Sequence, residues 1–529
     1  MDYFHYLCNL LDILQMKKYL FTSLLIYIIG IGDATAQEPL QLTDGLRYDL
    51  SMQGSVSSGD HTPLWMNANR YGLSSLEKSN GYLRAGVFRP LEIDSARRWG
   101  IGYGADGAIA YHFTSNFVIQ QAYVEARWLK GVLTVGAKEQ PMELKNNELS
   151  SGTQALGINA RPVPQVRLAL PDYWTIPGTK DWLAVKGHIA YGKTTDDGWQ
   201  KDFVNPDARY TEGTLYHSKA GYLKIGKEEK KLSVEMGIEM ACVFGGTAYM
   251  KGDDGNKIYH NASDLKAFFH ALIPGGGEVN ETTYQNEEGN HVGSWLFRLN
   301  YDTRDWCVSL YADKFFEDQS AMFMLDYDGY GTGEDWNVKK ESRFLLYDFK
   351  DIMLGAELKL RNSSWLQDIV IEYLYTKYQS GPVYHDRTIS FSDHIGGIDE
   401  YYNHHILMGW QHWGQVMGNP LYLSPLYNDD GVIEVKNSRF KAWHLGISGE
   451  PLPKLRYRLL ASWQDGLGRY KNPYTHRKYN TSLYAEVGWA FARDWKATAA
   501  WGADFGSIRG DNNGIQLTIS KTGLLKTRR

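Results

Sequence analysis

The chain has little cysteine and, beyond its first 36 residues, no long hydrophobic run. Its 529 residues include three Cys, carry a formal net charge of −5 and have a mean hydropathy of −0.43. A membrane-spanning helix needs about 20 apolar residues in a row, so a bundle of such helices is excluded. Lys and Arg form no basic block, so nucleic acid is not an expected partner. Cys242 and Cys307 lie in expected strands, and we interpret them as packing residues rather than a disulfide.

The first 36 residues have the pattern of a signal peptide. A Lys-Lys pair follows Met16 directly, an apolar stretch covers 19–32, and segment 34–36 reads Ala-Thr-Ala. Residues 1–15 contain no Lys or Arg, so translation is expected to start at Met16. An uncleaved membrane anchor is the alternative, but the apolar stretch is short for a spanning helix. We predict cleavage near Ala36 and a mature chain of 37–529.

The mature chain reads as strands in which every second residue is apolar. From Trp99 to Tyr111 the alternate positions are apolar, and Gly, Ala or Asp stand between them. Segments 232–244 and 455–463 repeat this pattern, which is typical of transmembrane β-barrels with an apolar lipid face and a polar lumen. The expected strands are 46–52, 82–93, 99–111, 117–128, 132–139, 163–170, 183–191, 215–224, 232–244, 293–301, 306–312, 351–360, 367–378, 438–448, 455–463, 482–491, 496–505 and 514–520.

The connections between these strands alternate in length. Short polar turns such as 302–305 and 492–495 alternate with long loops such as 245–292 and 379–437. Eighteen strands, an even number, place both termini on the periplasmic side. The predicted fold class is therefore all-β: a transmembrane antiparallel β-barrel with long extracellular loops, surrounded by outer-membrane lipid of a Gram-negative bacterium. The residues expected to face the lumen are Glu125, Arg127, Lys186, His188, Glu235, Glu239, Arg456 and Arg458.

Three loop stretches combine aromatic residues with amides and arginines. Sugar rings stack on Trp and Tyr, while their hydroxyl groups need planar donors and acceptors such as Asn, Gln and Arg. The alternative is that these side chains pack the loops against the barrel wall and cap its opening. The candidate carbohydrate-binding residues are Trp65, Asn67, Asn69, Arg70, Tyr71, Asn159, Arg161, Tyr401, Tyr402, Asn403, Trp410, Gln411 and Trp413.

Stretches 62–72, 159–165 and 401–421, together with the strand rhythm, resemble the Wzi-like capsule assembly family in its Bacteroidetes branch. The resemblance covers nearly the whole mature chain. It implies a monomeric eighteen-stranded barrel that acts as a surface lectin and holds exported capsular polysaccharide at the cell surface. The chain departs from the common barrel pattern in its last residues, 522–529, which contain no terminal aromatic residue.

Other functions have less support in the sequence. A nucleophile motif or a facing pair of carboxylates is missing, so we expect no enzyme activity, no catalytic residues and no cofactor. A porin-like solute channel is the alternative function, because the expected lumen is charged. One loop holds five histidines, but adjacent His404 and His405 should point to opposite sides of an extended segment, so no metal site is expected. The five are His385, His394, His404, His405 and His412.

Overall fold

The computed structural model describes residues 41–227, 229–252, 255–273, 289–317, 351–384, 395–398 and 400–525, with short pieces between 322 and 340. Residues 43–529 form one compact unit. The predicted signal peptide with its cleavage site, and also His385 and His394, lie outside the described residues.

No helix in the described part of the chain is both long and apolar enough to cross a membrane.

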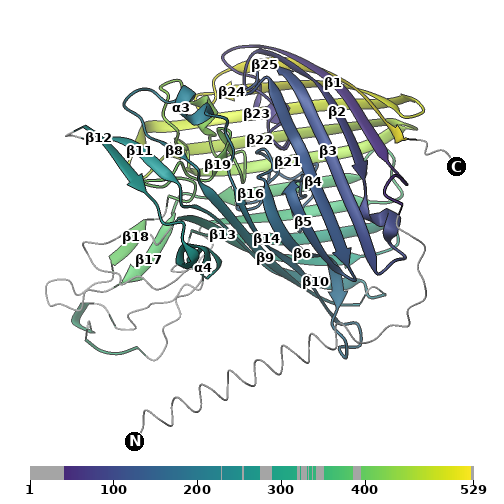
Figure 1. The fold of residues 1–529 in the computed structure, drawn as a ribbon, viewed down its shortest axis with the longest axis horizontal. Helices are drawn as coiled ribbons and strands as arrows, with labels where there is room; N and C mark the ends of the chain where they lie inside the picture. Colours follow the sequence, from purple (N-terminus) through teal and green to yellow (C-terminus); the bar gives the residue numbers. More distant parts are fainter. Residues whose placement is uncertain are drawn as a thin grey trace, which may run out of the picture. The chain divides into compact units, whose positions relative to one another are not determined.

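A single closed sheet of 18 antiparallel strands forms the barrel, which confirms the predicted fold class (Figure 1). Each strand pairs with its neighbours along the chain, and the first pairs with the last, so that Arg47 lies opposite Leu524. Each of the eighteen expected strands corresponds to one strand of the sheet. The strands are β1 (Arg47–Ser58), β2 (Ser79–Arg89), β3 (Trp99–Tyr111), β4 (Phe117–Trp128), β5 (Gly131–Ala137), β6 (Gln165–Thr175), β7 (Leu183–Lys193), β9 (Leu215–Ile225), β10 (Leu232–Phe244), β13 (Asn290–Asp302), β14 (Trp306–Phe316), β15 (Ile352–Leu360), β16 (Asp368–Tyr375), β21 (Arg439–Leu452), β22 (Leu455–Gly468), β23 (Pro473–Ala492), β24 (Trp495–Gly506) and β25 (Asn512–Leu524).

The two rims of the barrel differ as the turn lengths predict. The ends of β1 and β25 share one rim with short turns such as 303–305 and 493–494, and this is the periplasmic rim. One of these turns, between β2 and β3, contains the short helix η1 (Leu91–Asp94). The long connections at the other rim contain α2 (Leu64–Asn67), α3 (Trp199–Phe203), β8 (Tyr210–Glu212), β11 (Thr247–Gly252), β12 (Gly255–His260), α4 (Leu265–Leu272), η2 (Gly333–Asp335), β17 (Ser380–Tyr384), β18 (Ile395–Ile398), β19 (Gln411–His412), β20 (Gln415–Val416) and η3 (Pro425–Tyr427).

Alternation along the strands separates an apolar outer face from a polar inner face. On β3 the outward side chains of Ile109 and Tyr111 are exposed, whereas inward Asp106 is buried and accepts from Arg84 Nε of β2 at 3.0 Å. The pattern fails at the end of β10, where Met240, Cys242 and Phe244 were expected to face lipid. All three are buried, and Cys242 and Phe244 pack against Ala267 and Ala271 of α4, so the expectation was wrong there.

The charged residues expected in the lumen point inward, and most are paired. Lys138 Nζ lies 2.7 Å from Glu125 Oε1. Arg458 Nη2 lies 3.1 Å from Glu486 Oε2. The two cysteines in the described part of the chain are free, with Cys242 buried and Cys307 partly exposed.

An arginine on the outer face of β10 should destabilise the barrel. Met236 is exposed on that face, so Met236→Arg is expected to lower the free energy of unfolding in bilayers by roughly 2–4 kcal/mol. Urea unfolding in liposomes measures this change. Ser233→Arg on the inner face of the same strand is the control, and an equal loss there would contradict the assignment of the two faces.

Candidate functional site

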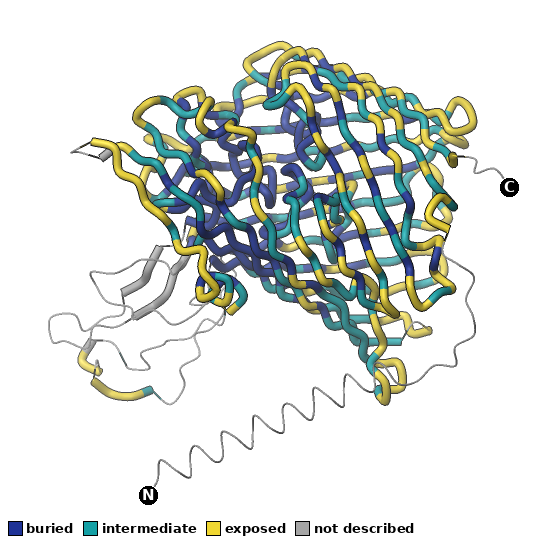
Figure 2. Tube along the Cα trace, in the orientation of Figure 1, coloured by how far each residue is buried: buried dark blue, intermediate teal, exposed yellow. Residues whose placement is uncertain are grey.

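Three extracellular connections fold back into the barrel and pack together there (Figure 2). We call residues 62–76, 140–163 and 400–438 the plug. Most of their side chains are buried, and they contact inward-facing residues of the wall. Leu64 N donates to Asp504 Oδ2 of β24 at 3.0 Å, and the Trp65 ring lies 4.9 Å from the ring of His444 on β21. The plug therefore forms a hydrophobic core inside the barrel.

Two asparagines predicted to bind sugar join the three segments of the plug. Asn69 N donates to Asn159 Oδ1 at 3.1 Å, and Asn159 Nδ2 donates to the Val416 carbonyl at 2.9 Å. Gly72 permits this approach: its φ is +70°, and a Cβ there would lie 2.4 Å from Arg161 N.

A buried polar network fixes the second plug segment to the wall. Glu372 on β16 accepts from Ser150 Oγ at 2.6 Å and from Ser151 N at 2.8 Å. Lys145 Nζ lies 3.0 Å from Asp313 on β14, and both side chains are almost fully buried. Because each group is desolvated, loss of one partner leaves the other without compensation.

The structure brings the predicted carbohydrate-binding residues together, but mostly as packing groups. Trp410 is 1% exposed, stacks with Tyr216 at 5.9 Å and donates from Nε1 to the Ala155 carbonyl at 2.9 Å. Sugar binding by these side chains stays a prediction, and their burial leaves no ring face of Trp410 open to a ligand. Also buried are Trp65, Asn67, Asn159, Arg161, Tyr401, Tyr402, Asn403, Gln411 and Trp413, whereas Asn69, Arg70 and Tyr71 are partly exposed.

Two of the loop histidines, His404 and His412, form hydrogen bonds with the backbone. His412 Nδ1 is 2.8 Å from the Arg161 carbonyl and its Nε2 accepts from Thr195 N at 3.1 Å; burial lowers the pKa of His412 to about 4. His404 Nδ1 accepts from two backbone N–H groups, and burial lowers its pKa to about 3. The His404 and His405 rings lie 4.4 Å apart, so the expectation of opposite directions was wrong. Among the described residues no group of three His, Cys, Asp or Glu could hold a metal ion.

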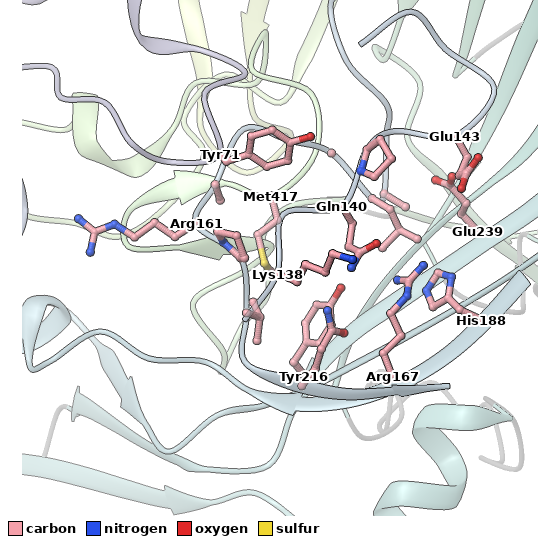
Figure 3. Close-up of a pocket in the computed structure, with 18 of the residues that line it drawn as sticks. Tyr71, Lys138, Gln140, Glu143, Arg161, Arg167, His188, Tyr216, Glu239 and Met417 are labelled. Carbon is pink, nitrogen blue, oxygen red and sulfur yellow. The ribbon is translucent and has the colours of Figure 1, made fainter. Parts of the chain in front are cut away.

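A cavity of about 90 Å³ lies between the plug and the wall formed by β6, β7, β9 and β10 (Figure 3). Arg167 and His188 lie side by side on the wall, with Gln140 of the plug above them. One buried water needs roughly 10–15 Å³ of such space, so the cavity can hold several waters. Ligand pockets usually hold about 300–1,000 Å³, so this cavity suits water or a small polar group rather than a sugar chain.

The extracellular side also presents an aromatic surface that the sequence did not reveal. The three-stranded sheet of β12, β11 and β8 places Tyr210 opposite Tyr249, and their rings stack at 4.8 Å and 14°. Tyr249 Oη donates to Glu212 Oε2 at 3.2 Å. Both tyrosines are partly exposed. We call Tyr210, Glu212 and Tyr249 the tyrosine platform; its strands are too short to show alternation.

No family model matches the chain, and no curated protein matches it. Among solved structures it is similar to Escherichia coli Wzi, an outer membrane protein involved in group 1 capsule assembly and described as a carbohydrate-binding β-barrel. The two are 12% identical over 90% of this chain and 84% of that chain, with a TM-score of 0.52. Pseudomonas aeruginosa OccK2 in complex with glucuronate is 9% identical over 91% and 98%, with a TM-score of 0.44. OccK9 of the same organism is 8% identical over 92% and 100%, with a TM-score of 0.45. At such identities the likeness shows the fold: the chain is a β-barrel of the kind found in the outer membranes of Gram-negative bacteria.

Proposed function

We propose that this barrel is a non-catalytic, lectin-like protein that attaches or organises capsular or other exported polysaccharide at the cell surface. The main support for this proposal is the plug, which packs inside the barrel. Solute diffusion needs a continuous water path, whereas the three plug segments pack around a hydrophobic core that includes Trp65, Tyr402 and Trp410. The likeness of the fold to a carbohydrate-binding barrel adds support.

The tyrosine platform is the accessible surface that best fits a sugar. Parallel aromatic rings offer an apolar face for the C–H groups of a sugar ring, and Glu212 beside them can accept from hydroxyl groups. In this proposal the buried aromatic residues of the plug hold the extracellular connections in shape, and the platform makes the contact. The protein acts as a monomer.

Replacing both platform tyrosines should release polysaccharide. Tyr210→Ala combined with Tyr249→Ala removes the stacked rings without touching the plug, so the barrel should insert normally while cell-bound polysaccharide falls severalfold. Polysaccharide in the cell fraction and in the medium is measured by immunoblotting. Tyr259→Ala is the matched control, because Tyr259 belongs to the same sheet and alternates with Ile258, the residue opposite Tyr249. Unchanged retention in the double variant would count against the platform.

A solute channel is the second candidate, and the periplasmic opening favours it. A groove of about 660 Å³ lies there among charged residues that include Lys224, Arg298 and Lys359. Lys359 and Arg298 both pair with Glu357, whereas Lys224 lies 5.7 Å from the Tyr173 ring. Large, steady single-channel currents from the unmodified chain in planar bilayers, without glycan binding, would favour the channel over the lectin.

A further inference from the structure

One stretch of the outer wall carries polar side chains where a barrel should face lipid. On β9 the inward residues Tyr216, Ser218 and Tyr222 alternate with outward His217 and Lys219. A cation on the lipid face is costly because no water is available to solvate it. This part of the wall therefore needs a cover.

The helix α4 supplies that cover. Ala267 and Ala271 are 0% exposed and bring the helix close to the wall. The Phe268 ring lies 5.2 Å from the Tyr191 ring of β7 and 5.3 Å, edge-on, from the Phe244 ring of β10. Figure 1 shows α4 outside the barrel, next to the extracellular ends of its strands.

Specific hydrogen bonds fix the helix in place. Lys219 Nζ donates to the carbonyl oxygens of Ala271 at 2.9 Å and Leu272 at 2.5 Å. The last carbonyls of a helix have no partner within the helix and attract a cation, so this contact satisfies both sides. Tyr191 Oη donates to the Phe268 carbonyl at 2.7 Å. Lys219, which would be unfavourable against lipid, thus becomes the anchor of α4.

The side of α4 that faces away from the wall is apolar and exposed. Leu265, Phe269 and Ile273 are 89%, 57% and 56% exposed, and a spacing of four residues places them on one stripe. Lys266 and His270 flank the stripe on one edge only. An apolar stripe with a polar edge is the pattern of a helix that lies in a membrane interface.

We propose that lipid of the outer leaflet covers Leu265, Phe269 and Ile273, so that α4 serves as a lipid-facing part of the barrel. The stripe continues a surface already assigned to lipid: Ile189 on β7 and Met236 on β10 are 47% and 41% exposed on the outer face. The helix therefore ties the connection between β10 and β13 to the plane of the membrane.

Site-specific fluorescence tests this contact. Phe269→Cys is made in the mature chain with Cys307→Ser, labelled with a polarity-sensitive dye and reconstituted in phosphatidylcholine nanodiscs. Cys242 stays because it is 0% exposed. Brominated phosphatidylcholine should quench the label by about half or more, whereas aqueous iodide should quench it little. Ile189→Cys on the wall should behave in the same way. Lys266→Cys, on the polar edge, should show the reverse.

Two results would overturn the proposal. The first is a Phe269→Cys label that iodide quenches as strongly as the Lys266→Cys label, with no effect of brominated lipid, since the stripe would then face water. The second is efficient disulfide linkage between two Phe269→Cys chains in native membranes, which would make a second copy of the chain the occupant. Phe269, Ile189 and Lys266 are all exposed, so none of the three cysteine substitutions should prevent folding. The change in gel mobility that folded barrels show on heating verifies folding for each variant.

Discussion

Replacing Asp313 and Glu372 together by Ala is expected to convert a barrel that conducts little into one that conducts steadily. Asp313→Ala leaves Lys145 buried without a carboxylate, and breaking such a pair costs about 3–5 kcal/mol. Glu372→Ala removes the acceptor of Ser150 Oγ, Ser151 N and Tyr311 Oη. The segment 140–163 then loses its contacts with Asp313 and Glu372, while others, such as those from Asn146 Nδ2 to Glu357 and Asp368, remain.

A free-energy cost of about 3–5 kcal/mol lowers the ratio of barrels with the plug bound inside to barrels with the plug displaced. The ratio falls by roughly a hundredfold to a few thousandfold. Single-channel recording in planar bilayers measures the change directly. Glu235→Ala is the control, because Glu235 faces the lumen but accepts from the wall residues Tyr173 and Asn300 rather than from the plug. If the folded double variant passes no more single-channel current than the unmodified chain, other contacts hold the plug in the barrel.

Trp410→Ala should destabilise the plug rather than act on a ligand directly. The side chain is 1% exposed, so truncation removes its contacts with Tyr216, leaves the Ala155 carbonyl without its donor and opens a cavity. Large-to-small changes of this kind cost about 3–5 kcal/mol. Limited proteolysis of the plug and thermal unfolding in detergent measure the loss.

A comparison of Trp410→Phe with Trp410→Ala separates packing from binding. Phenylalanine keeps much of the ring volume but lacks the indole N–H, so it should restore most of the stability that alanine loses. Polysaccharide retention should then follow plug stability across both variants. Loss of retention in a Trp410→Phe chain whose plug is as stable as the original would show that the indole itself contacts sugar.

The barrel could be predicted from the sequence because lipid imposes a rule on every second residue. From Trp99 to Tyr111 the alternation of apolar residues can be recognised from the sequence alone. It fails at Cys242 and Phe244, where α4 replaces lipid as the neighbour of the wall. It also misses the ends of β23, which begins at Pro473, because strand portions outside the bilayer need not alternate.

The site was harder to predict because packing and sugar binding use the same side chains. Trp65, Asn159 and Trp410 have the aromatic and amide chemistry of a saccharide site. Only the structure shows that these side chains are buried inside the barrel. The stack of Tyr210 and Tyr249 could not be predicted, because it arises from a pairing between strands that the sequence does not state.

The contacts between the first connection and the last strands constrain the order of folding. Asp60 N and His61 N donate to Asn512 Oδ1 at 2.9 Å, and Leu64 N donates to Asp504 Oδ2, across roughly 440 residues or more of chain. Residues 60–64 therefore lack these hydrogen-bond partners until β24 and β25 have formed. Until then Leu64, Trp65 and Met66 form an apolar cluster without its final neighbours, which a chaperone would need to shield while the rest of the chain arrives. The contacts of residues 60–64 with β24 and β25 thus form only after the last strands of the barrel have been made, although these residues are synthesised among the first.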